Sequence, residues 1–278
     1  MTTSTTAAMP AAARPAPARR PAPARVWSLA RAEILLLVRN RTALFNALAV
    51  APATVAFLAW IGAGSFPGAG GGAEATATFL LTVLAAIALV FVVYYNLTTT
   101  LVARREELVL KRLLSGEVSA TEIVAACATP AVAVVLGQLV LGAVAVGVWF
   151  TVPDVADPLW LLLGLAGGTV VFVLLAVVSS GLTRTVESAQ LTTLPVIMLT
   201  MVLSGFTVPL EALPDVVGTI ASWTPMYPVV ALVEAGLGAG PAAGGTLTAV
   251  GQPLLCLALW TVAGLGGARR WMRWEPRR

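Results

Sequence analysis

The sequence predicts an all-α membrane protein with six transmembrane helices, an N-terminal interfacial helix and short outer re-entrant helices before the last span. Hydrophobic residues make up 58% of the 278 residues and charged residues only 11%, and the mean hydropathy is +0.91. A soluble domain would carry about a quarter charged residues. Six long apolar runs are the second observation behind this fold class, and the placement of the basic residues between them is the third.

Each apolar run is long enough to cross the hydrocarbon core, which takes about 20 helical residues with some allowance for tilt. A Gly-rich connection follows the first run, and a short acidic connection follows the third. The predicted spans, within a few residues at each end, are Leu44–Ala63, Phe79–Val102, Ile123–Phe150, Leu159–Leu182, Leu191–Val208 and Leu247–Gly267.

The basic residues all fall on one side of this threading. Of the 17 Lys and Arg residues, seven precede the first span, four lie between the second and third, one lies between the fourth and fifth, and five follow the last. Because Lys and Arg near span ends are retained in the cytoplasm, both termini are expected on the cytoplasmic side. The spans are expected to cross the plasma membrane of a bacterial cell. The charges expected outside are all acidic: Glu74, Asp154, Asp157, Glu211, Asp215 and Glu234.

Residues 1–25 form an Ala/Pro/Arg-rich leader with little to bury, and we expect this leader to be disordered. Residues 26–42 mix Trp27 and Leu29 with charged residues, which favours a helix lying in the membrane interface with its charges toward water and headgroups. The alternative, that these residues only lead into the first span, is equally compatible with the sequence. The rest of the chain, 26–278, is predicted to be one six-span membrane domain.

The cytoplasmic connection, residues 103–122, carries a mechanistic pattern. Helix-forming residues from Arg104 to Leu114 place Glu107 four residues before Lys111, the favourable orientation for an ion pair on one helix. Gly116 is a plausible stop, and Ser119 with Glu122 has the spacing of a capping box that opens the third span. An ordinary charged loop that obeys the positive-inside rule is the alternative.

The last outer segment, residues 204–245, is the longest outer connection and is too hydrophobic for a simple loop. Two short helices bounded by prolines and dipping back toward the membrane would fit this composition. Irregular backbone at membrane depth requires cover from neighbouring protein.

Several kinds of chemistry are excluded or disfavoured. The chain has no histidine, and its one lysine, Lys111, follows Leu110, so that a phosphate-binding loop of the G-x-x-x-x-G-K-[ST] type cannot exist. Any ATPase must be another chain. Cys127 and Cys256 are interpreted as small apolar packing residues. The net charge of +4 comes from basic residues that flank the spans, and contact with anionic lipid headgroups explains them better than nucleic-acid binding does.

The predicted span cores contain no ionisable side chain, which disfavours an ion-driven carrier. Asn96 and Gln138 are the clearest buried polar residues. Either could face a substrate path, although a hydrogen bond between helices is the commoner role for such residues.

The segment Leu203–Leu237, with Ser-Gly, a nearby Pro, Leu-Pro and a later Pro before the last span, resembles the membrane subunit of ATP-binding-cassette exporters of the second type. This family includes drug-resistance and polysaccharide-export permeases. The cytoplasmic stretch REELVLKRLLSGEVSATEIV is similar to the coupling segment of the family, and Pro52 fits its first span. The resemblance covers nearly everything after residue 25.

The resemblance implies roles for three groups of residues. A connecting helix near the ATPase would contain Arg31, Glu33, Arg39 and Arg41. A coupling helix, with the turn after it, would dock into the ATPase through Glu106, Glu107, Lys111, Arg112 and Gly116. An outer gate of broken helices would be shaped by Gly205, Pro209, Pro214 and Pro225. For each proline, simple helix termination is the plainer interpretation.

The resemblance also implies partners. Two ATPase subunits would bind ATP and Mg, no cofactor would be bound by this chain, and a second permease chain, identical or similar, would complete the path. The substrate would be hydrophobic or amphipathic, because the spans offer no fixed charge. A secondary carrier, a membrane-bound enzyme and a non-transporting membrane anchor or immunity factor are the rivals.

Overall fold

The computed structural model describes residues 22–62, 71–114, 119–151, 153–205, 210–240, 242–243 and 246–271. Within these ranges every regular element is helical, which confirms the predicted all-α class. The elements are α1 (Ala22–Arg39), α2 (Arg41–Trp60), α3 (Ala73–Ile87), the π-helix η3 (Ala88–Tyr95), α4 (Asn96–Glu106), α5 (Val109–Leu114), α6 (Ala120–Trp149), α7 (Pro158–Leu182), α8 (Val186–Val202), the 3-10 turn η4 (Leu210–Ala212), α9 (Asp215–Ala221), α10 (Tyr227–Gly236) and α11 (Leu247–Trp271).

Four helical segments of the described chain are long and apolar enough to cross a membrane: Ala73–Glu106, Ala120–Trp149, Pro158–Leu182 and Leu247–Trp271. They coincide with the second, third, fourth and sixth predicted spans. The first and fifth predicted spans correspond to α2 and α8, which fall outside this set, α8 because it has only 17 residues. The count of six spans therefore stays a prediction.

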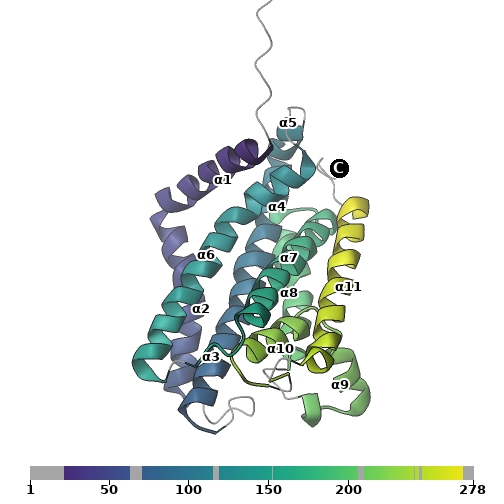
Figure 1. Ribbon diagram of the computed structural model, residues 1–278. Coiled ribbons are helices and arrows are strands. Elements are labelled where there is room, and N and C mark those ends of the chain that lie inside the picture. The colour runs from purple at the N-terminus through teal and green to yellow at the C-terminus, as the bar shows by residue number, and fades with distance from the viewer. Residues whose placement is uncertain are drawn as a thin grey trace, which may run out of the picture.

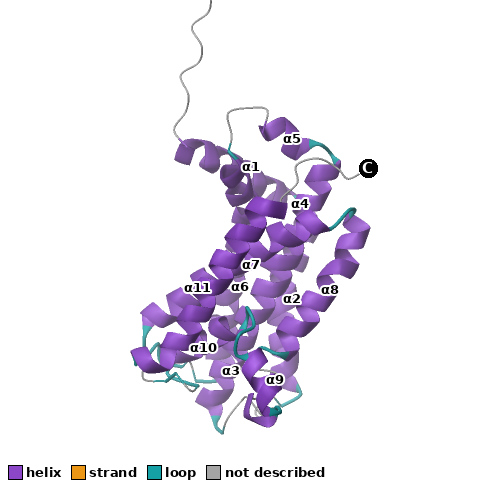
Figure 2. Ribbon diagram, turned by 90° about the vertical axis from the view of Figure 1, so that its right-hand side faces the viewer, coloured by secondary structure: helices purple, strands orange, loops and turns teal. Residues whose placement is uncertain are grey.

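The longest segment, α3–η3–α4, runs through the middle of the bundle and supplies nearly half of the buried residues of its main hydrophobic core. It packs against α6, α7 and α8, and α2 lies against α3 and α6. Figure 1 shows these helices side by side, with α1 and α5 at one end of the bundle and α9 at the other, and Figure 2 shows the same division from the side.

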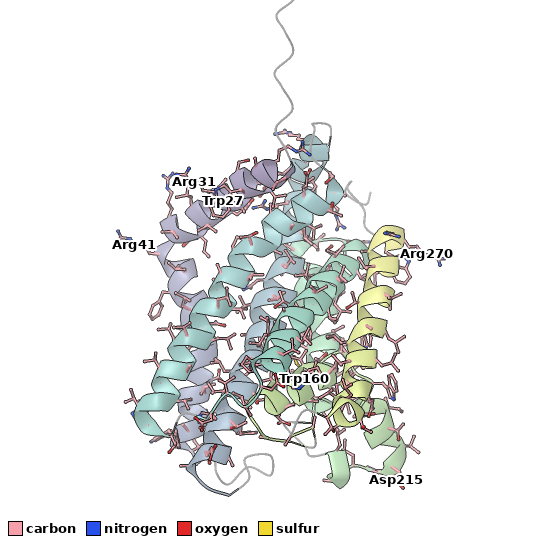
Figure 3. All side chains as sticks on the ribbon, in the orientation of Figure 1. Trp27, Arg31, Arg41, Trp160, Asp215 and Arg270 are labelled. Atoms are coloured by element: carbon pink, nitrogen blue, oxygen red, sulfur yellow. The ribbon has the colours of Figure 1, made fainter. Side chains whose placement is uncertain are left out.

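Basic residues labelled in Figure 3 gather at one of these ends. Figure 3 places Arg31, Arg41 and Arg270 at the end that carries α1, and Asp215 at the opposite end. The last helix, α11, finishes with Arg269 and Arg270 at the α1 end. Arg31, Arg41 and Arg270 thus share one end of the bundle (Figure 3), as the sequence predicted for the basic residues.

The end opposite α1 is closed by α10, which packs against α7, α11 and α3. Almost every residue of α10 is buried, from Pro228 to Gly236. A Cβ added at Gly236 would lie 2.6 Å from the backbone nitrogen of Leu161 in α7, so glycine permits this close approach. The prediction of two short helices in 204–245 matches α9 and α10, while their re-entry into a membrane stays a prediction.

Candidate functional site

The predicted coupling segment is not one helix. Helix α4 ends at Glu106, and the chain turns through Glu107 and Leu108 before α5 begins at Val109. Leu108 has a φ of 59°, in the left-handed region that residues other than glycine seldom adopt. The prediction of one continuous helix from Arg104 to Leu114 is therefore wrong, because a corner at Leu108 separates α4 from α5.

This corner changes the surroundings of the predicted coupling residues. Glu107 lies in the turn before α5 and the backbone of Lys111 lies in α5, so the two residues are not four apart on one helix as expected. The side chains of Glu106, Glu107 and Arg112 are exposed. The backbone of Lys111 lies in α5, but its side chain and the whole of Gly116 lie outside the described residues.

Helix α5 is held to the bundle by Leu110, whose side chain is only 2% exposed and joins the main hydrophobic core. Helix α6 then begins with the capping box that the sequence predicted. Ser119 Oγ accepts a hydrogen bond from the Glu122 backbone N–H at 3.3 Å, and Glu122 Oε2 accepts one from the Ser119 N–H at 2.7 Å. The apolar anchor holds α5, with its exposed Arg112, against the bundle.

Helix α1 is clamped across this end of the bundle by two ion pairs. Arg25 Nη2 lies 2.8 Å from Glu122 Oε1 on α6, and Glu33 forms a two-pronged pair with Arg104 at the end of α4. Paired oxygens and nitrogens of this kind fix orientation as well as proximity. The clamp makes α1 a part of the bundle rather than a free lead-in.

Two expectations about this region are corrected by the structure. Glu33 was expected to face water with the other charges of the connecting helix, yet it turns inward to Arg104, while Arg31, Arg39 and Arg41 are exposed as expected. The helix begins at Ala22 and ends at Arg39, a few residues earlier at each end than the predicted range 26–42. Arg25, placed in the leader by the sequence, therefore belongs to α1.

Arg105 is a buried arginine that sequence reasoning missed. Its side chain is 2% exposed, and it donates hydrogen bonds to the carbonyl oxygens of Ser180 at 2.7 Å, Thr183 at 2.5 Å and Arg184 at 3.1 Å. The last carbonyls of a helix lack partners within the helix, and a cation at this end is favourable. Arg105 thus ties the end of α4 to the α7–α8 connection.

The two neighbouring arginines of α4 point to different partners because successive helix residues lie about 100° apart. Arg104 reaches α1, and Arg105 reaches the end of α7. The sequence signal for the buried Arg105 was the adjacent pair Arg104–Arg105 at the end of a span. Two successive helix residues cannot lie on the same side of the helix.

A cleft of about 560 Å³ lies between α1, the segment η3–α4, and α6. Asn96, a candidate for the substrate path, lines this cleft, whereas Gln138 is fully buried on α6 and does not. The two candidates are therefore not brought together. The lining also includes Glu33, Asn40, Phe91, Tyr95, Thr99, Thr100, Arg104, Cys127, Pro130, Ala131 and Val134.

At the opposite end, the residues assigned to an outer gate occupy separate positions. Gly205 follows α8 with a φ of 90°, Pro214 is the exposed N-cap of α9, and Pro225 is buried between α9 and α10. Pro209 lies outside the described residues.

The connection from α9 to α10 is held by hydrogen bonds to α8 and α11. The Thr224 hydroxyl donates to the Leu203 carbonyl at 3.2 Å, and Trp260 Nε1 donates to the Trp223 carbonyl at 2.8 Å. The loop that contains Pro225 is therefore tied to the C-terminal end of α8 and to the middle of α11.

These features define a polytopic helical membrane protein with a charged helical end and no nucleotide-binding loop in its sequence. Residues 56–268 match the sequence model of a family described as ABC-2 family transporter protein, and the chain belongs to this family. It is accordingly the membrane permease subunit of an ATP-binding-cassette transporter, and the family implies an ATPase partner. No curated protein matches the chain.

Proposed function

We propose that this permease works in an exporter that moves a hydrophobic or amphipathic substrate, such as a drug, a lipid-like molecule or a glycan, out of a bacterial cell. The observation that supports the proposal is the charged end of the bundle: Glu107 in the turn and Arg112 on α5 are exposed, and Arg104 and Arg105 connect the end of α4 to α1 and α7. A docking ATPase that moved α5 would act on α4 directly, and through α4 on α1 and α7.

The proposed threading has six spans, formed by α2, α3–η3–α4, α6, α7, α8 and α11, with both termini in the cytoplasm. The 17 residues of α8 extend roughly 26 Å at about 1.5 Å per residue. A hydrocarbon core of about 30 Å can accommodate a helix of this length by local thinning. The basic end of the bundle supports a cytoplasmic position for α1 and α5.

The proposed assembly has two permease chains, identical or similar, and two ATPase subunits that bind ATP and Mg. ATP binding would draw the ATPases together and shift the permeases between inward-open and outward-open packings. Arg31, Glu33, Arg39 and Arg41 would lie near the ATPase, and Glu106, Glu107, Lys111, Arg112 and Gly116 would dock into it. Gly205, Pro209, Pro214 and Pro225 would shape the outer gate.

Charge reversal on the coupling segment tests the proposal. In membranes that contain the permease and its ATPase, Glu107→Lys and Arg112→Glu are expected to reduce ATP-driven transport about tenfold, the change that a loss of about 1.4 kcal/mol of docking energy would produce. ATP hydrolysis should continue and membrane insertion should be unchanged. Arg269→Glu, the same reversal at an exposed site on α11, is the control. Unchanged transport in both coupling variants would refute the docking assignment.

The rival functions predict other results in the same membranes. Transport that stops when the proton gradient is collapsed with ATP still present would identify a secondary carrier. A chain that purifies without any ATPase and moves no substrate would be an anchor or immunity factor.

A further inference from the structure

The cleft beneath α1 has a polarity gradient along its length. Arg104, Thr100 and Thr99 line it near the charged end, and Tyr95, Asn96 and then Phe91 follow toward the middle of the bundle. From Arg104 to Phe91 the helix extends roughly 20 Å. On α6 the lining passes in the same direction from Cys127 to Val134. One end can therefore hydrogen-bond a headgroup, and the other end is apolar.

A π-helical stretch provides an independent reason to regard this cleft as functional. Segment η3, Ala88–Tyr95, interrupts the α-helical pattern in the middle of the most buried span. Such stretches are rare and occur frequently at functional sites. Phe91 within it is 37% exposed, although most neighbouring residues of η3 are buried, and its side chain lines the cleft.

The charges of the cleft select against a strongly ionic ligand. Among the described lining residues, Glu33 and Arg104 alone carry formal charges, and they form an ion pair with each other. An anion or a cation therefore finds both of these charges already paired, whereas a hydroxyl or amide headgroup can bond to Asn40, Asn96 and the threonines without disturbing the pair.

We infer that this cleft binds an amphiphile with an uncharged, hydrogen-bonding headgroup and a single apolar tail. The headgroup lies near Asn40, Thr99 and Asn96, and the tail lies over Phe91 and Val134. A volume of about 560 Å³ is in the range of small-molecule sites. The inference rests on the proposed function in that the bound amphiphile is taken to be the exported cargo.

Photo-crosslinking with a neutral amphiphile tests this site without requiring transport. The permease with its ATPase is placed in phosphatidylcholine nanodiscs, and an alkyl maltoside with a diazirine in its tail is added and activated. Peptide mapping should find the label on η3–α4 and on the Cys127–Val134 part of α6. Unlabelled alkyl maltoside should compete, and alkyl sulfate or alkyl trimethylammonium of equal length should compete poorly.

Ala131→Phe fills the cleft and is expected to reduce this labelling about tenfold. Ala143→Phe makes the same change at an exposed position of α6 outside the cleft and should leave it unchanged. Labelling no stronger than on the exposed face of α6 at Val140–Val148, or equal labelling in both variants, would overturn the site. Specific labelling of a chain that shows no ATP-driven transport would support the site and refute the proposed function.

Discussion

Replacing Arg105 with methionine is expected to lower the free energy of unfolding by about 3–5 kcal/mol, because hydrogen bonds from a charged donor contribute about 1.5–3 kcal/mol each and do not add fully. The substitution leaves the carbonyl oxygens of Ser180, Thr183 and Arg184 without this buried donor. The loss should appear as a lower temperature of aggregation when the purified protein is heated in detergent and analysed by size-exclusion chromatography.

Two companion variants separate the role of Arg105 from a general effect of charge. Arg184→Met removes an exposed charge from the same connection and should have little effect. Arg105→Lys keeps the charge but loses the planar fork that reaches several carbonyls, so an intermediate loss is expected. Equal stability of Arg105→Met and Arg184→Met would contradict the assignment of Arg105 as the tie between α4 and the α7–α8 connection.

Gly236→Ala should separate α10 from α7 and destabilise the end of the bundle opposite α1. The added Cβ would lie 2.6 Å from both the nitrogen and the Cβ of Leu161, and because a backbone atom is involved no side-chain rotation relieves the clash. Alanine gains about 1 kcal/mol over glycine within a helix, whereas overpacking costs about 1–3 kcal/mol. We expect the clash to win, with a net loss of about 1–2 kcal/mol.

Gly266→Ala on α11 is the matched control, because an added Cβ there meets nothing within 4 Å. It should be neutral or more stable by up to about 1 kcal/mol. The same heating experiment measures both variants. If Gly236→Ala were as stable as Gly266→Ala, the close approach of α10 to α7 would be refuted.

The features that the sequence predicted best depend on neighbouring residues. The capping box of Ser119 and Glu122 is set by spacing alone, and it was found where expected. The apolar runs at 159–182 and 247–267 match α7 and α11 closely, since an uninterrupted hydrophobic run leaves few other structures open. The all-helical class follows from the same constraint.

The features that the sequence did not reveal depend on residues far apart in the chain. The pairing of Glu33 with Arg104, and of Arg25 with Glu122, requires knowledge of how α1 lies across α4 and α6. The corner at Leu108 contradicts the local helix propensity of the segment, and tertiary anchoring of Leu110 in the core accompanies it. The cleft joins three elements, so no single segment predicts it.

ATPase docking requires that α5 lie on the cytoplasmic side of the membrane. Labelling of single cysteines tests this position most directly. In a background with Cys127→Ala and Cys256→Ala, Glu107→Cys and Asp215→Cys mark the two ends of the bundle. A maleimide that cannot cross membranes should label Asp215→Cys in intact cells and Glu107→Cys only after permeabilisation. Labelling of Glu107→Cys in intact cells, with Asp215→Cys protected, would contradict the account.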